Sequence, residues 1–242
     1  MVDLVIAKGR LVAQEGKLLA DLPSTEYPEW VLQSVHFPRK LTAGDFKLAA
    51  PAKPVVSAHV IGIIENQAPT RHLHLQIEVK DGQVQADMQR DIAKLAMVER
   101  HRSTGNIQLG LVQGFGFSEP CAVATTVAHD SHHMIVVGTN DADMAIAANF
   151  LAGCGGGQVV VQRGEIIGKV ELPIAGLMSN EGASIVANKA ATVLEGFKAC
   201  GCLIHNPNMQ LSLLGLVVIP ELRISDLGLV DVTRFDFIPV LE

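Results

Sequence analysis

Three histidines and a carboxylate lie within five consecutive positions, in the run His129-Asp130-Ser131-His132-His133. Imidazole and carboxylate groups are typical ligands of Zn, Mn and Fe sites. Alternatively, a histidine such as His129 acts as a general base that Asp130 orients. In a third interpretation Asp130 and Ser131 make a turn and the histidines bond to the backbone. The candidate metal ligands are His129, Asp130, His132 and His133.

A second polar cluster is the run Glu99-Arg100-His101, which Thr104-Gly105-Asn106 follows. One interpretation is structural: helix-dipole and capping preferences alone favour Arg, His and then Gly at the end of a helix, so these residues need no further role. In the functional interpretation the cluster faces the same cleft as His129. Glu99 and His101 then join His129 and Asp130 as candidate catalytic groups, and the candidate substrate-binding residues are Arg100, Asn106 and Ser131.

His72 and His74 lie two positions apart in an alternating segment, so they share one face of an expected strand. No neighbouring strand is expected to carry matching ligands. We therefore interpret the pair as part of a solvated strand face.

Several elements must position these residues, and they alternate between strands and helices in a way typical of an α/β fold with mixed sheets and packed helices. The clusters fall where these elements end. A helix that begins at Thr139 or Asn140 has acidic residues in its first turn, which favours its N-terminus. Expected strands cover residues 55–65, 71–79, 109–117, 122–128, 133–138, 159–161 and 165–172, and helices cover 87–101, 139–153 and a segment that Ser179 or Asn180 caps.

The N-terminal part has a different residue pattern, with short apolar runs followed by recurring prolines. Short apolar runs separated by Lys8-Gly9 and Glu15-Gly16 predict a small β meander. Prolines then recur between residues 21 and 54, among apolar residues such as Trp30 and Phe37, which predicts an extended arm lying on another surface. We therefore divide the chain into residues 1–55 and an α/β domain of residues 56–242.

The composition limits the partners. The 242 residues are 48% hydrophobic and 18% charged, which is typical of a globular protein, and the net charge of −6 gives no reason to expect nucleic acid or an anionic membrane. No stretch reaches the roughly 20 apolar residues of a membrane span, and the N-terminus does not match a signal peptide. We expect a cytoplasmic protein.

Beyond these patterns, several long motifs resemble the C-terminal domain of the metal-dependent adenine deaminases. The strongest covers residues 125–132 and 135–141, around the His129–His132 run. One departure is His133, where the family is expected to have Asn. The remaining motifs are residues 98–101, 104–106, 114–116, 172–179, 218–222 and 228–232, with residues 27–31 and 39–42 matching the arm that joins this domain to the rest.

This resemblance implies an enzyme that hydrolyses adenine to hypoxanthine and ammonia in purine salvage. The family's metal centre, usually described with Mn or Fe, lies on a barrel, and no segment of this chain matches the barrel's ligands. The resemblance thus implies that the chain alone is inactive, that a separate barrel domain or chain is its partner, and that no organic cofactor is required.

Two alternatives stay open. The chain is a stand-alone module that binds a purine or a metal without deamination, or it is an independent enzyme that uses the residues around His129 and Glu99. The exposed arm favours a second copy or a barrel as partner, and a homodimer is expected.

Overall fold

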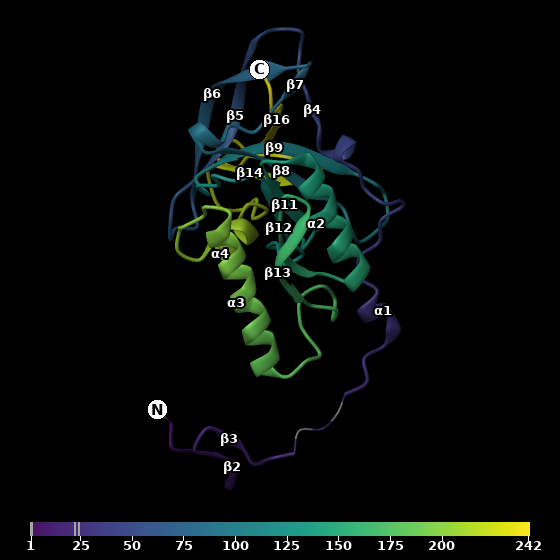
Figure 1. Cartoon of the computed structure of the whole chain (residues 1–242), viewed down its shortest axis with the longest axis vertical. Helices are drawn as coiled ribbons and strands as arrows, with labels where there is room; N and C mark the ends of the chain where they lie inside the picture. The colour runs from purple at the N-terminus through teal and green to yellow at the C-terminus, as the bar shows by residue number, and fades with distance from the viewer. Residues whose placement is uncertain (1, 22, 24) are drawn as a thin grey trace.

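The computed structural model describes residues 2–21, 23 and 25–242, and a sheet of ten strands forms its centre (Figure 1). Neighbouring strands of the described residues pair antiparallel, apart from β5 and β9, which are parallel. In spatial order the strands are β13 (Glu165–Glu171), β12 (Gly157–Gln162), β10 (Cys121–Thr125), β11 (Met134–Gly138), β8 (Ile92–Val98), β9 (Ile107–Gln113), β5 (Val55–Ile63), β6 (Thr70–Lys80), β7 (Gln83–Val84) and β4 (Leu48–Ala49).

Helices cover both faces of the sheet. Helix α2 (Asp141–Cys154) packs on one face and α3 (Ala183–Ala199) on the other (Figure 1). Side chains of a strand alternate between the two cores, so Met97 lies in the core beneath α3 and its neighbour Val98 lies in the core beneath α2. The predicted α/β class with mixed sheets and packed helices is confirmed.

The helix predicted over residues 87–101 is wrong. A single 3-10 turn, η2 (Met88–Arg90), is capped by the side chain of Asp87, and strand β8 follows it. All seven residues of β8 are buried. Both of its faces pack in a core, and its one charged residue, Lys94, is buried as well. The strand therefore lacks the alternation of polar and apolar residues that reveals a period of two, and the spacing of its apolar residues resembles that of a helix. The Glu99–His101 run therefore follows a strand and does not end a helix.

The prediction for α2 is confirmed at both ends. Asn140 caps the helix by accepting hydrogen bonds from the backbone N–H groups of Ala142 and Asp143. Gly155 ends it with a φ of +82°, a left-handed conformation that favours glycine. Helix α3 begins later than predicted, after Gly182.

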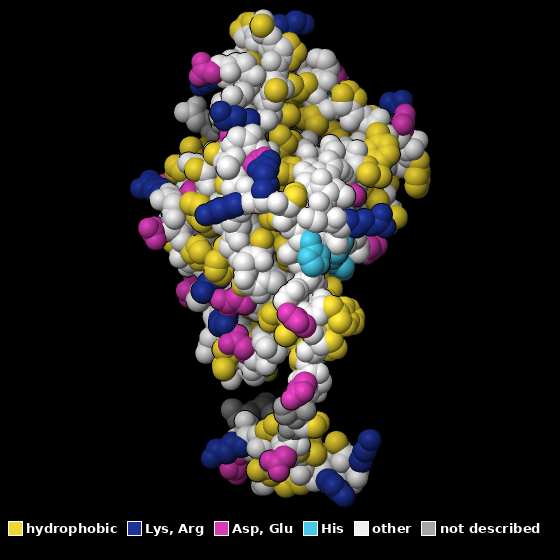
Figure 2. Space-filling model, turned by 90° about the vertical axis from the view of Figure 1, so that its right-hand side faces the viewer, with side chains coloured by type: hydrophobic (Ala, Val, Ile, Leu, Met, Phe, Trp, Pro, Cys, Tyr) yellow, Lys and Arg dark blue, Asp and Glu magenta, His cyan; other side chains and the backbone are white. Residues whose placement is uncertain are grey.

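The predicted N-terminal meander is confirmed as the antiparallel sheet β1 (Leu4–Ala7), β2 (Arg10–Gln14) and β3 (Lys17–Leu18). It lies apart from the main body (Figures 1 and 2). The arm contains the short helix α1 (Glu29–Leu32) and the turn η1 (Ala43–Phe46). Its second half packs on the α2 face, where Phe46 is fully buried. The domain boundary near residue 55 stays a prediction.

The C-terminal part packs on the α3 side of the main sheet. Its elements are α4 (Pro207–Leu213) and the antiparallel strands β14 (Leu222–Ser225), β15 (Gly228–Asp231) and β16 (Asp236–Ile238). None of the helices described is both long and apolar enough to cross a membrane.

The expectation that no neighbouring strand carries a partner for His72 and His74 is wrong. Strand β5 pairs antiparallel with β6, and His59 on β5 lies directly opposite His74. The two histidines of β6 therefore share their face of the sheet with a third.

Candidate functional site

The two polar runs found in the sequence lie where the central strands β8, β10 and β11 of the main sheet begin or end. Val98, the last residue of β8, pairs with Met134, the first residue of β11, and Thr125, the last residue of β10, pairs with Ile135. The loops formed by residues 99–106 and 126–133 therefore emerge side by side. We call them the 99 loop and the 126 loop.

Glu99 organises the 99 loop. Its carboxylate accepts hydrogen bonds from the backbone N–H groups of His101, Arg102 and Thr104 and from the Thr104 hydroxyl. Burial raises the pKa of Glu99, but these donations outweigh it and hold the pKa at about 2. Both carboxylate oxygens are engaged within the loop, and the catalytic role of Glu99 stays a prediction.

Arg100 lies in the protein interior, with 1% of its surface exposed. Its guanidinium donates hydrogen bonds to the backbone carbonyls of His132, Ser34 and Ala175, the last two at 2.7 and 3.0 Å. Burial lowers its pKa to about 10. Arg100 thus joins the arm, the 126 loop and the loop after β13, and its predicted contact with a substrate stays a prediction.

His101 and His133 connect the two loops with the C-terminal sheet. His101 Nε2 lies 2.8 Å from the carbonyl oxygen of Ser131, and the His101 ring is 4.7 Å from that of His133. His133 is buried, and its Nε2 lies 3.5 Å from the carboxylate of Asp226. Burial lowers the pKa of His133, which Asp226 partly opposes. His133 is therefore a neutral imidazole at neutral pH, with Asp226 as its partner.

The other predicted metal ligands do not converge. The ring centroids of His129 and His132 are 5.3 Å apart with an angle of 65° between the ring planes, and His132 Nδ1 accepts a hydrogen bond from the backbone N–H of Ala128. Asp130 is largely exposed, and its carboxylate is 4.0 Å from His129 Nδ1. Within the part of the chain that the structure describes, three ligand side chains meet at a different place, on β5 and β6. Metal binding by the 126 loop stays a prediction.

A pocket of about 490 Å³ opens beside the 126 loop. Asp130 and Ser131 line it, and so does Asp226, whose carbonyl accepts a hydrogen bond from the side-chain amide of Asn106. The remaining lining residues come from the segment after α4 and from the C-terminal sheet: Gly215, Val217, Val218, Ser225, Leu227, Val230, Phe235, Asp236 and Phe237.

The lining of this pocket combines apolar side chains with carboxylates. Phe235 and Phe237 supply aromatic surfaces, while Asp130, Asp226 and Asp236 supply acceptors, and no described lining residue is cationic. A flat heterocycle that donates hydrogen bonds suits such a site. The C-terminal residues were missed in the sequence because no short-range pattern joins them to the loops, and 120 residues separate Asn106 from Asp226.

Comparison with known proteins agrees with the resemblance seen in the motifs. Residues 67–236 match the family model described as the adenine deaminase C-terminal domain. The chain is 51% identical over 240 residues to adenine deaminase 3 of Rhizobium meliloti (strain 1021) and 48% identical over 241 residues to an adenine deaminase of Moorella thermoacetica (strain ATCC 39073 / JCM 9320). In both cases 99% of this chain aligns with 40% of the relative. The chain thus spans about two fifths of the length of the curated relatives it matches.

Proposed function

Since the chain belongs to the adenine deaminase family, we propose that it is the C-terminal part of an enzyme that hydrolyses adenine to hypoxanthine and ammonia. In this proposal the reaction itself takes place on a barrel-bearing part that this chain does not include. That part would hold a divalent metal ion, Mn²⁺ or Fe²⁺, which activates a water molecule for attack on the purine ring. The proposal includes a role in purine salvage in the cytoplasm.

The observation that carries the proposal is the uncovered N-terminal meander. All four residues of β1 are exposed, and Leu4, Ile6 and Leu18 have 52–62% of their surface exposed. A short three-stranded sheet with no hydrophobic face in contact with a core is not stable by itself in water. The meander therefore requires another surface, and the barrel-bearing part is the proposed occupant.

The pocket beside the 126 loop supports the same arrangement. Its rim carries exposed apolar side chains, with Phe235 at 82%, Leu227 at 68% and Val218 at 63% exposure. Apolar side chains gathered around a polar loop are typical of a surface that a partner or ligand covers. We propose that Asp130 and Ser131 face the purine-binding side of the assembled enzyme, and that two copies of the enzyme form a dimer.

Reconstitution tests the proposal. This chain is mixed with the remaining part of a relative such as adenine deaminase 3 of Rhizobium meliloti, in the presence of Mn²⁺, and conversion of adenine to hypoxanthine is followed by ultraviolet absorbance. The expected result is negligible activity for each part alone and activity for the mixture. Failure of the mixture to form a complex and to convert adenine, under conditions in which the intact relative is active, contradicts the proposal.

The pocket also favours a second candidate, purine binding by the chain alone. Calorimetric titration with adenine and hypoxanthine tests it, with Phe235→Ser as the variant and Leu203→Ser, at a residue 80% exposed outside this pocket, as the matched control. Binding that Phe235→Ser weakens and Leu203→Ser preserves supports a stand-alone module. Absence of binding to the wild-type chain eliminates it.

A further inference from the structure

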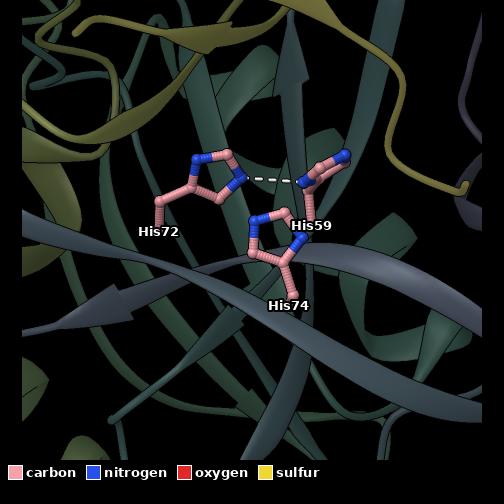
Figure 3. Close-up of side chains that lie close together, drawn as sticks. All are labelled: His59, His72 and His74. Atoms are coloured by element: carbon pink, nitrogen blue, oxygen red, sulfur yellow. Dashed lines mark hydrogen bonds between the residues drawn. The ribbon is translucent and has the colours of Figure 1, made fainter.

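Three histidines from two neighbouring strands meet on one face of the sheet, away from the loops described above (Figure 3). His59 on β5 is paired with His74 on β6, and His72 lies two residues earlier on β6. In an antiparallel pair, the opposite residue and the residue two positions away project from the same face. The register of β5 and β6 therefore brings the three side chains together.

The distances between the imidazoles suit a shared ligand. The three ring centroids lie 4.7–4.8 Å from one another, and one ligand nitrogen from each residue lies within 4.8 Å of the others. His59 Nδ1 and His72 Nε2 are 2.7 Å apart, as the dashed line in Figure 3 marks. Nitrogens bound to one tetrahedral ion at about 2.0–2.1 Å lie roughly 3.4 Å apart, so small side-chain rotations suffice.

Carboxylates surround the cluster. A carboxylate oxygen of Glu242 lies 3.1 Å from His59 Nε2 and 3.0 Å from His74 Nδ1. Asp231 lies 3.7 Å from His72 Nδ1, and Glu221 accepts a hydrogen bond from the backbone N–H of His72 at 2.7 Å. Histidines that bind metals characteristically pair their second nitrogen with a carboxylate, which fixes the tautomer and the ring orientation.

The C-terminal segment holds its carboxylate in place through the backbone. The N–H of His59 donates to the carbonyl of Val240, and the N–H of Glu242 donates to the carbonyl of Ser57, each at 2.9 Å. The Ser57 hydroxyl also donates to the Glu242 side chain at 2.6 Å. Glu242 is thus positioned as a fourth ligand or as the residue that orients two of the imidazoles.

We propose that His59, His72 and His74 form a binding site for a divalent transition-metal ion, of which Zn²⁺ fits best. Three imidazoles with a carboxylate are a common Zn²⁺ ligand set. The site would join β5, β6 and the C-terminal segment, and its role would be structural. It is independent of the proposed deaminase reaction, whose metal would lie on the other part of the enzyme.

The protonation state of the cluster agrees with the proposal. Burial and the neighbouring imidazoles lower the pKa values of His59 and His72, and the carboxylates only partly oppose this. Both are therefore neutral at neutral pH, which is the form that binds a metal. His74 has 57% of its side chain exposed and completes the site from the solvent side.

The test uses the purified chain after treatment with a chelator. Zn²⁺ is added, excess is removed by dialysis, bound metal is measured by mass spectrometry, and affinity is measured by calorimetry. The wild-type chain is expected to retain one equivalent of Zn²⁺ at this site. His74→Ala, at an exposed position where the fold tolerates truncation, and His72→Gln are each expected to weaken binding by about a hundredfold, because removing a ligand costs at least as much as removing an outer-shell partner.

Two control variants separate this site from other histidines. His205→Ala removes a side chain that is 81% exposed and contacts Glu65, and His129→Ala removes one from the 126 loop. Both are expected to keep the wild-type affinity. The proposal is overturned if the wild-type chain retains no Zn²⁺, if His74→Ala binds as the wild type does, or if His129→Ala abolishes the retained equivalent. Circular dichroism confirms that each variant is folded.

Discussion

The guanidinium of Arg100 donates a hydrogen bond from Nη1 to the carbonyl oxygen of Ser34 at 2.7 Å, across 66 residues of sequence. The backbone N–H of His36 donates in return to the carbonyl of Arg100 at 2.8 Å. These contacts hold the arm against the base of the 99 and 126 loops. The arm and the candidate site therefore form one unit in the folded protein.

Arg100→Met is expected to destabilise the chain. The substitution leaves the partly buried carbonyls of Ser34, His132 and Ala175 without their donor, and an acceptor left unpaired in the interior costs roughly 1–3 kcal/mol. The free energy of unfolding, measured in urea, is expected to fall by at least about 2 kcal/mol, with faster proteolysis of the arm. Arg102→Met, at an exposed neighbour, is expected to change it by less than about 0.5 kcal/mol. Equal effects of the two substitutions would show that the Arg100 hydrogen bonds add no stability.

Glu99→Gln is expected to remove a pH-dependent part of the stability. The pKa of Glu99 is lowered from 4.5 to about 2, so the folded state favours the ionised carboxylate. Its contribution is complete above about pH 4.5 and is lost as the pH falls towards 2. The wild type should therefore lose stability in this window faster than Glu99→Gln does. Parallel stability curves for the two proteins between pH 5 and pH 2 would contradict this role for the carboxylate.

The sequence predicted those elements whose boundaries carry local signals. Asn140 and Gly155 mark the ends of α2, and Gly-containing turns mark the meander. Strand β8 was mistaken for a helix because both of its faces are buried, which removes the polar alternation that identifies a strand.

The histidine cluster depended on information that local patterns do not contain. His72 and His74 were visible as one strand face, but their partner His59 is brought to them by the register between β5 and β6. The pocket had the same limitation, since its aromatic wall comes from the last strands of the chain.

Ile6→Asp is expected to prevent assembly with the barrel-bearing part without unfolding this chain. Ile6 is 62% exposed on the meander, so a carboxylate there stays solvated in the isolated chain. In the proposed complex the same carboxylate would be buried without a partner, which is strongly unfavourable. The reconstituted activity and complex formation by size-exclusion chromatography should both be lost, while thermal unfolding of the chain alone is unchanged.

Leu203→Asp, at a residue 80% exposed, is the control and should assemble normally. Assembly of Ile6→Asp at wild-type affinity would place the partner surface elsewhere.

The stability of the metal-free chain is expected to depend on pH through His59. Burial lowers the pKa of His59 from 6.5, with His72 adding to the effect and Glu242 and Asp231 opposing it. The unfolded chain therefore takes up a proton near pH 6.5 that the folded His59 resists, so stability falls as the pH is lowered below about 6.5. Denaturant unfolding between pH 8 and pH 5 with a chelator present should show this decline, and His59→Asn should reduce it.

Added Zn²⁺ should raise the wild-type stability most at pH 8, where protons compete least for the imidazoles. His205→Asn serves as the control, because it removes an imidazole that is 81% exposed and lies outside this cluster. The same slope in the wild type and His59→Asn would mean that other histidines cause the decline.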